Sequence, residues 1–426
     1  MKKENLIRIN RLAGPILLNY LVNILFETLD KMIVGHYSTL ALSAVGVGAS
    51  LTYVITGCFG VVSNAYHIQA AEYRGQKQMA DFYALFLKMI KIAFWIGVVW
   101  IMICFFGSRL FFSEIIGLQG QFLLESTAYF KVSSLTVLLN LLAFVFSVFY
   151  RNQEDTRKCF YFTVVSTSVN LFFDISLVFG KFGLPELGAV GAAWGSVIGL
   201  AAGMMVYLLP LRKLPLKNKK ISLKRIRQLF IPLFCQDFLE STLFTFFLTG
   251  FVAGLGVENT AVYQLNDTLL GFLMLVSYAY ASACSTLVIQ SRAAGKADVW
   301  EIRKLSFSCS SGILCVAGML LLVDYSCFYR LITTSQEIVL LSGNYLQYVL
   351  LLAILFVEKQ IDQSILQGCG REKEVMIVSA AANIAGLITA KALCIFGLKG
   401  IYAGLVMRSF VYIFGNYILL KEIRSE

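Results

Sequence analysis

The sequence predicts an all-α integral membrane protein of twelve transmembrane helices, arranged as two pseudo-symmetric lobes of six. Hydrophobic residues make up 58% of the 426-residue chain and charged residues only 14%, which is too apolar a composition for a soluble domain. Apolar stretches long enough to cross a bilayer recur along the whole chain. Only five prolines occur, and the stretches lack the short alternation of barrel strands, so we expect helices.

Twelve apolar stretches are the predicted spans, and six of them precede the middle of the chain. They cover residues 12–34, 43–66, 88–106, 126–149, 159–180, 188–210, 229–252, 260–289, 305–323, 341–366, 375–396 and 400–420. A basic N-terminus leads straight into the first span, with no short apolar region and small-residue cleavage site. We therefore interpret the first span as an uncleaved helix and not as a signal peptide.

The formal net charge of +11 does not indicate a nucleic-acid partner, because the basic residues are concentrated in the predicted loops. Most Lys and Arg residues lie in the loops that would face the cytoplasm. The opposite loops hold only Arg109, Lys181, Arg330 and Lys399. By the positive-inside rule, we expect a multi-pass protein of the cell membrane, plasma or inner, with both termini in the cytoplasm.

The two halves of the chain resemble each other. Pro15 opens the first span and Pro232 the seventh, and SAVG at 43–46 corresponds to TAVY at 260–263. We therefore divide the chain into an N-lobe, 1–211, a basic cytoplasmic linker, 212–228, and a C-lobe, 229–426. Each lobe has an even number of spans, which predicts parallel repeats with a central site between them, as in transporters.

Polar residues form two stripes in the apolar spans of the N-lobe. The residues are Asn19, Asn23, Glu27 and Asp30 in the first span and Ser166, Asn170 and Asp174 in the fifth. Their spacing of about four residues places each set on one helical face. An ionisable group inside a bilayer costs at least about 2.5–3.5 kcal/mol, so such groups commonly carry function.

The oxygen groups of these stripes suit a proton or a hard cation. With Ser196 of the sixth span, they give the N-lobe two carboxylates, amides and a hydroxyl that could converge on such an ion. Asn19, Asn23 and Glu27 would form a polar stripe along a cavity. Each acid could instead be a buried structural group that is hydrogen-bonded to a neighbouring helix.

The C-lobe carries a different set of acids. Asp237 and Glu240 share a face of the seventh span, and Glu358 and Asp362 lie in the tenth. Lys359 lies between the latter two and could neutralise one of these carboxylates. Each of these acids, Glu240, Glu358 and Asp362 among them, could carry function or be a buried structural group.

The sequence does not indicate an enzyme or a cofactor. A membrane-embedded transferase would need a nucleophile–base or metal-binding constellation near one face. The chain has only two histidines, and the motifs D-D-x-x-D and H-x-x-x-D do not occur in it. The ten cysteines include no C-x-x-C pair and indicate no disulfides.

Two segments carry a family resemblance. GPILLNYLVNILFETLDKMIVGHYSTLALSAVGVG, 14–48, resembles the opening of the multidrug and toxic compound extrusion (MATE) family, and VNLFFDISLVFGKFGLPELGAVGAAWGS, 169–196, resembles that family's N-L-x-x-D segment. The resemblance implies a twelve-helix, monomeric antiporter with a V-shaped cavity. Such a protein exports cationic or amphipathic organic compounds in exchange for H⁺ or Na⁺ by alternating access, with membrane lipids around it.

The resemblance also implies site residues. The cation-coupling site of the DinF-type branch maps onto Asp30, Asn170, Asp174 and Ser196, with Ser in place of Thr, and the first three of these residues could hold Na⁺. In addition, DFLESTLF, 237–244, resembles the seventh-span motif of NorM-type members, in which Glu240 would join a second cation site in the C-lobe. Glu358 and Asp362 are both candidates for the tenth-span acid of that site. The chain is similar to both branches, so the lobe that holds the coupling site stays open.

A lipid-linked oligosaccharide flippase of the same superfamily is the alternative function. Such flippases often carry basic residues in the cavity. The basic residues within spans are few, namely Lys31, Lys131, Lys359, Lys391 and Arg408, so an antiporter is favoured.

Overall fold

The computed structural model describes residues 2–213, 221–295, 299–333 and 335–425, and side chains in parts of α1 and α2, Glu27 among them, lie outside the description. Within these ranges all regular structure is helical, as the sequence predicts. The chain divides into two compact units, one of residues 18–226 and the other of 227–426 together with 1–17. The predicted linker, 212–228, falls partly outside the described residues.

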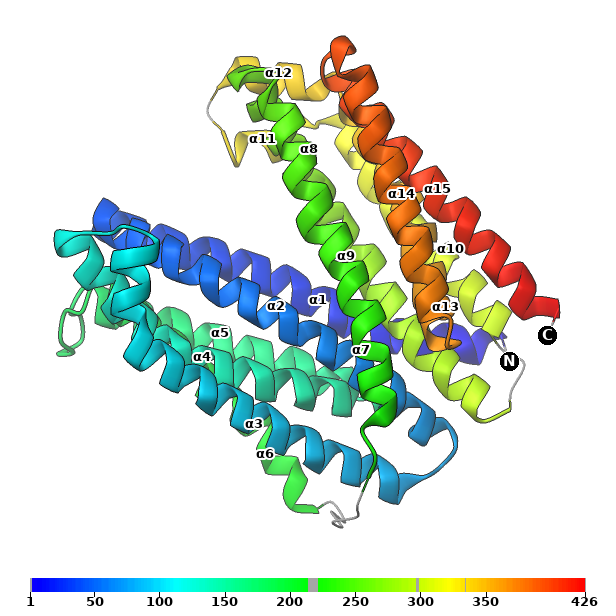
Figure 1. The fold of residues 1–426 in the computed structure, drawn as a ribbon, viewed down its shortest axis with the longest axis horizontal. Coiled ribbons are helices and arrows are strands. Elements are labelled where there is room, and N and C mark those ends of the chain that lie inside the picture. The colour runs from blue at the N-terminus through cyan, green and yellow to red at the C-terminus, as the bar shows by residue number, and fades with distance from the viewer. Residues whose placement is uncertain (1, 214–220, 296–298, 334, 426) are drawn as a thin grey trace. The chain divides into compact units, whose positions relative to one another are not determined.

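The unit of residues 18–226 consists of long helices that run side by side (Figure 1). In chain order they are α1 Lys2–Tyr37, whose first residues belong to the other unit, α2 Thr39–Gly75, α3 Met79–Leu110 with the π-helix η1 Phe111–Ile115, α4 Gly120–Asn152, α5 Thr156–Val178, α6 Ala189–Leu208 and the 3₁₀-helix η2 Leu209–Lys213. The hydroxyl of Ser38 caps α2 by accepting from the backbone N–H of Leu40 at 3.2 Å.

The second unit contains more and shorter elements. They are α7 Lys224–Asp237, which begins just before the unit, the π-helix η3 Phe238–Leu243, α8 Phe244–Ala253, α9 Val257–Ala293, α10 Val299–Val323, α11 Ser326–Arg330, α12 Gln336–Gly343, α13 Leu346–Gly368, α14 Glu372–Leu393, the 3₁₀-helix η4 Cys394–Phe396 and α15 Leu398–Ser425. The repeated prolines lie at matching places, Pro15 within α1 and Pro232 within α7.

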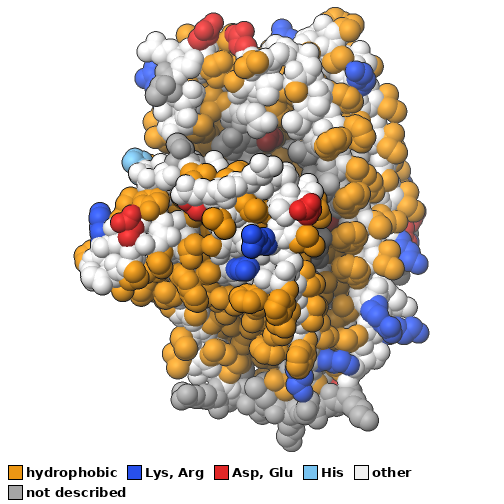
Figure 2. All heavy atoms as spheres, turned by 60° about the vertical axis from the view of Figure 1, so that its left-hand side comes forward, with side chains coloured by type: hydrophobic (Ala, Val, Ile, Leu, Met, Phe, Trp, Pro, Cys, Tyr) orange, Lys and Arg blue, Asp and Glu red, His pale blue; other side chains and the backbone are white. Residues whose placement is uncertain are grey.

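Helices long and apolar enough to cross a membrane dominate both units. The described residues hold ten of them, or eleven if α12 and α13, which meet at a bend of 56°, form one broken span. The prediction of a membrane-spanning helical protein is thus confirmed, while the number twelve stays a prediction. Many large apolar side chains are exposed, such as Phe106 at 73% and Leu320 at 68%, and Figure 2 shows hydrophobic side chains over much of one face. Such a surface suits lipid and not water.

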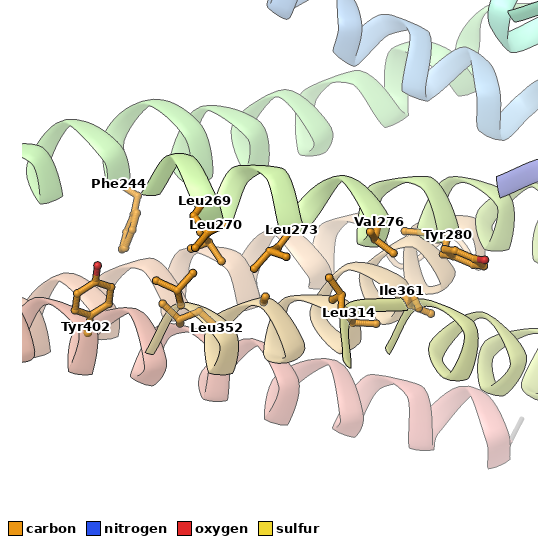
Figure 3. Close-up of a cluster of buried hydrophobic side chains, with 14 of the residues drawn as sticks. Phe244, Leu269, Leu270, Leu273, Val276, Tyr280, Leu314, Leu352, Ile361 and Tyr402 are labelled. Atoms are coloured by element: carbon orange, nitrogen blue, oxygen red, sulfur yellow. The ribbon is translucent and has the colours of Figure 1, made fainter. Parts of the chain in front are cut away.

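The core of the second unit centres on α9. Leu269, Leu270, Leu273 and Val276 of α9 point toward Leu314 of α10, Leu352 of α13 and Tyr402 of α15 (Figure 3). All of these side chains are buried. The cluster therefore fixes α9, α10, α13 and α15 against one another, which positions the polar groups that these helices carry.

Candidate functional site

Close packing between α5 and α6 positions the side chains of the first candidate site. α6 places four glycines against α5 at intervals of four residues: Gly191, Gly195, Gly199 and Gly203. A Cβ atom on Gly199 would lie 2.5 Å from the backbone oxygen of Ser166 and 2.6 Å from Cβ of Asn170, and one on Gly195 would overlap the carboxyl group of Asp174. Only glycine permits this approach, so the backbone of α6 lies directly on the polar stripe of α5.

Asp174 is the centre of this site. Its side chain is buried at 1% exposure, and its carboxyl group interacts with Asp30 of α1 and with Asn170 by hydrogen bonds. Asn170 in turn donates through Nδ2 to Oγ of Ser196 at 3.4 Å. The structure therefore gathers the four side chains of the predicted N-lobe site from α1, α5 and α6. Whether they bind the coupling cation stays a prediction.

The carboxyl pair constrains the chemistry of the site. An ionised carboxylate only accepts hydrogen bonds, so a hydrogen bond between two carboxyl groups requires a proton on one of them. In addition, Oδ1 of Asp174 is buried and has no hydrogen-bond partner among the described residues. A buried oxygen of this kind, beside a second carboxyl group and an amide, fits a proton or a small hard cation. The described residues hold no group of three or more His, Cys, Asp or Glu that could bind a metal ion.

The polar stripe of α1 continues toward α5. Nδ2 of Asn23 donates to Oδ1 of Asn19 at 3.3 Å, and that same oxygen accepts from the hydroxyl of Thr163 on α5. The side chain of Glu27, the third predicted member, lies outside the described residues. The sequence interpretation missed Thr163, although extending the stripe of α5 backward by about one turn would have reached it.

Tyr129 of α4 is a further neighbour that the sequence interpretation missed. Its side chain is 9% exposed, it interacts electrostatically with both Asp30 and Asp174, and its ring packs 2.6 Å from the position that a Cβ on Gly48 would take. No repeat or motif marks Tyr129 in the sequence, because the chain has 20 tyrosines. Its position against the carboxyl pair emerges only from the packing of α2 and α4.

In the second unit, Glu240 lies on the π-helix η3 and is bound by several donors. Nζ of Lys359, on α13, lies 2.6 Å from Oε2. The other oxygen, Oε1, accepts from Nε2 of Gln236 at 2.8 Å, from Oγ of Ser379 at 3.0 Å and from Nε2 of Gln363 at 3.4 Å. The expectation that Lys359 could neutralise an acid is met at Glu240.

The remaining acids of α13 have another partner. Arg303 of α10 binds Asp362 with both arms of its guanidinium, Nε to Oδ1 at 2.6 Å and Nη2 to Oδ2 at 2.7 Å. Its Nη2 also lies 3.5 Å from Oε1 of Glu358. Glu358 and Asp362 therefore both form structural ion pairs with Arg303. A role of either residue in cation coupling stays a prediction.

Comparison with known proteins identifies the family. The MatE family model matches residues 15–176 and 232–390, two segments that begin at Pro15 and Pro232. The chain is 24% identical over 379 residues to the probable multidrug resistance protein NorM of Thermotoga maritima, covering 87% of this chain and 81% of that protein. It is also 24% identical over 378 residues to the probable multidrug resistance protein YoeA of Bacillus subtilis, covering 84% and 80%.

Solved structures agree at the level of the fold. A crystal structure of MATE in the straight conformation superimposes with a TM-score of 0.87 at 15% identity and covers 99% of this chain and 96% of that one. A MOP superfamily transporter from Pyrococcus furiosus superimposes with a TM-score of 0.84 at 16% identity, with the same coverage. Because the family model matches most of the chain and the fold agrees throughout, this protein belongs to the MatE family of membrane transporters, which are not in general enzymes.

Proposed function

We propose that this protein is a secondary active antiporter that exports small organic compounds, cationic or amphipathic, in exchange for H⁺ or Na⁺. The observation that carries the proposal is the buried contact between the carboxyl groups of Asp30 and Asp174. The multidrug resistance proteins among the relatives support efflux as the direction and organic compounds as the substrates.

The carboxyl pair offers two charge states. With one shared proton or one bound Na⁺, the repulsion between two carboxylates is relieved, and without it both charges face each other away from bulk water. When bound, the cation supplies the charge that stabilises the ionised pair. Asp30 and Asp174 would hold it, Asn170 and Ser196 would orient it through neutral oxygens, and Gly195 keeps α6 close enough to exclude water.

Coupling then requires that the two charge states prefer different conformations. A bound cation can shift the transporter between inward-open and outward-open states only by binding one of them more tightly than the other. We propose that α1 changes its approach to α5 between these states, since the two carboxyl groups sit on these two helices. Separation of the pair would release the cation, and renewed contact would require one.

The same proposal includes the wider architecture. The protein would act as a monomer in the cell membrane, with twelve spans in two lobes and with both termini and the linker at 212–228 in the cytoplasm. The paired matches of the family model and the basic loops on one side support this arrangement.

The test is transport by the purified protein in proteoliposomes, with an imposed gradient of H⁺ or Na⁺ and a fluorescent organic cation as substrate. Asp30→Asn and Asp174→Asn should each reduce gradient-driven export to the level of empty vesicles. The double variant should be no worse than either single variant, because members of one functional unit are strongly non-additive. Asp155→Asn is the matched control, since Asp155 lies in a loop and pairs with Lys158 at 2.6 Å. Normal export by both span variants would overturn the coupling role of the pair.

A further inference from the structure

Protein donors contact both oxygens of the Glu240 carboxylate. Oε2 lies 2.6 Å from the ammonium group of Lys359, and Oε1 accepts from Gln236, Ser379 and Gln363, all within 3.4 Å. Three donors already exceed the two lone pairs of Oε1, and the donor on Oε2 carries a positive charge. A mobile cation that binds both oxygens would therefore have to displace a donor that the fold itself supplies.

Lys359 is held in place from several sides. Its side chain is 8% exposed, and its ammonium group lies 4.5 Å from the centre of the Tyr412 ring and 5.2 Å from that of Phe356. Aromatic faces attract a cation, more strongly when water is excluded. The ammonium group is thus fixed by a carboxylate and two rings, and it has little freedom to leave.

Two other charged groups complete the surroundings of Glu240. The guanidinium of Arg408, on α15, lies 3.7 Å from the centre of the Phe244 ring and donates through Nη2 to the backbone oxygen of Glu240 at 3.4 Å. Asp237 interacts electrostatically with Glu240 and accepts from the hydroxyl of Ser241 at 3.5 Å. Neither group reaches the carboxylate oxygens in the contacts described, so Lys359 is the direct counter-charge.

We infer that Lys359 is a tethered cation that occupies, at Glu240, the place a mobile coupling cation would take. Glu240 then stays paired throughout the transport cycle, and the coupling cation binds at another site. The inference goes beyond the proposed function, and it assigns Lys359 a specific role, namely to close Glu240 to H⁺ and Na⁺.

The pairing predicts a rescue that a coupling carboxylate would not show. Removing one partner of a buried ion pair leaves the other charge uncompensated, whereas replacing both by neutral groups of similar volume is often tolerated. Glu240→Gln and Lys359→Met should each lower the apparent Tm by several degrees and lower the export rate. The Glu240→Gln/Lys359→Met double variant should recover the Tm and more than about half of the wild-type export rate, as expected for two residues in one interaction.

The decisive measurement is export by the double variant in proteoliposomes, beside its Tm in detergent. Recovered export with the ion dependence of the wild type would support the tethered cation. A double variant that folds with a normal Tm but exports nothing would overturn it, because Glu240 would then be needed as a carboxylate. Arg303→Met/Asp362→Asn, on the neighbouring ion pair of α13, is the matched control for replacing a buried pair.

A second measurement keeps the inference falsifiable if the variants transport poorly. Lys359→Met leaves a buried carboxylate without its counter-charge, so the Tm of this variant should rise with added Na⁺ or with lowered pH beyond any rise in the wild type. The double variant should lack this extra rise. Absence of the extra rise in Lys359→Met would show that no mobile cation can take this place. Should the wild type itself show no gradient-driven export, the proposed function fails, but the Tm series still tests Lys359.

Discussion

The helix pairs α5–α6 and α14–α15 pack by the same device, but they carry different chemistry. Gly195 of α6 lies on the carboxyl group of Asp174, while Gly404 of α15 lies on Ala390 of α14, where a Cβ added to the glycine would be 2.5 Å from the alanine methyl carbon. One turn farther along, Gly199 meets Asn170 in the first pair, and Arg408 meets Gly386 in the second. The two helix pairs therefore share the glycine contact and differ in the polar groups that it covers.

The difference extends to the nearest charges. In the first unit a carboxyl group faces another carboxyl group, Asp30 against Asp174, and in the second a carboxylate, Glu240, faces the ammonium of Lys359. A pair of like groups needs a proton or cation to be stable, and an opposite pair is already neutral. Burial of an acid alone therefore does not indicate cation coupling. The charge of its partner decides whether a mobile ion is required.

The largest effect should come from placing a methyl group between α5 and α6. Gly195→Ala should abolish export and its dependence on the driving ion, because the added Cβ would overlap the carboxyl group of Asp174. Gly404→Ala, the counterpart on α15, should lower stability by about 1–3 kcal/mol through overpacking and leave the ion dependence unchanged. Proteoliposome export and thermal unfolding of both variants separate the two effects.

Gly312→Ala on α10 is the control for the glycine series, since a Cβ added there would have no atom within 4 Å and alanine favours a helix. Equal loss of ion dependence in Gly195→Ala and Gly404→Ala would contradict the distinction between the two units.

An intermediate effect should follow the loss of a neutral ligand. Asn170→Ala removes the hydrogen bonds of Asn170 to Asp174 and to Ser196. Because one neutral hydrogen bond contributes a net free energy of about 1 kcal/mol, the export rate at a low concentration of the driving ion should fall by about twofold to tenfold. Ser379→Ala removes one of the donors to Glu240 and should leave the apparent affinity for the driving ion unchanged. The measurement is the export rate as a function of Na⁺ or H⁺ concentration. An equal shift of the apparent ion affinity in both variants would contradict the assignment of ion coupling to the first unit alone.

The smallest effect should come from an acid far from both the Asp30–Asp174 pair and the Glu240–Lys359 pair in the chain. Asp324 follows α10 and accepts hydrogen bonds from Oγ and the backbone N–H of Ser326, at 2.6 Å and 2.9 Å, which hold the pKa of this carboxyl below its usual range. Since the folded-state pKa is lowered, the stabilisation is present above the unfolded pKa of about 3.9 and is lost as pH falls through the folded value.

Asp324→Ala should therefore lower the Tm slightly at pH 7, and the difference from the wild type should shrink once the pH falls below about 4. Export should not change. A Tm difference that persists at acidic pH would mean that Asp324 acts by its shape and not by its charge.

The sequence predicted the elements and one face of each, but not the partner that each face would meet. Spacing by four placed Ser166, Asn170 and Asp174 on one stripe, and the structure brings Asp174 against Asp30. The hydropathy of the chain predicted membrane helices, which the fold confirms. Both inferences rest on local periodicity, which depends only on helical geometry.

The choice of partners could not be read in the same way. Glu358, Lys359 and Asp362 are neighbours on α13, yet Lys359 pairs with Glu240 while Glu358 and Asp362 pair with Arg303. Consecutive residues of a helix differ by about 100° in direction, so neighbours in the chain reach different helices. Arg303 lies just before the predicted span 305–323, and only the packing of α10 on α13 brings it to these acids.

The π-helix η3 has a consequence for how the second unit tolerates insertions and deletions. A π-turn holds one more residue than an α-turn, so loss of a single residue between Phe238 and Leu243 would restore α-helical geometry. Such a deletion would leave the helix before and after it facing much as it does now, but it would change the direction of residues inside the wide turn, where Glu240 lies. Gln236 and Phe244, which flank η3 and contact Glu240 and Arg408, would keep their directions, so the contact between Gln236 and Glu240 would be disturbed. In this stretch the length of the chain matters as much as the identity of its residues, and a one-residue gap here would be a more drastic change than most substitutions.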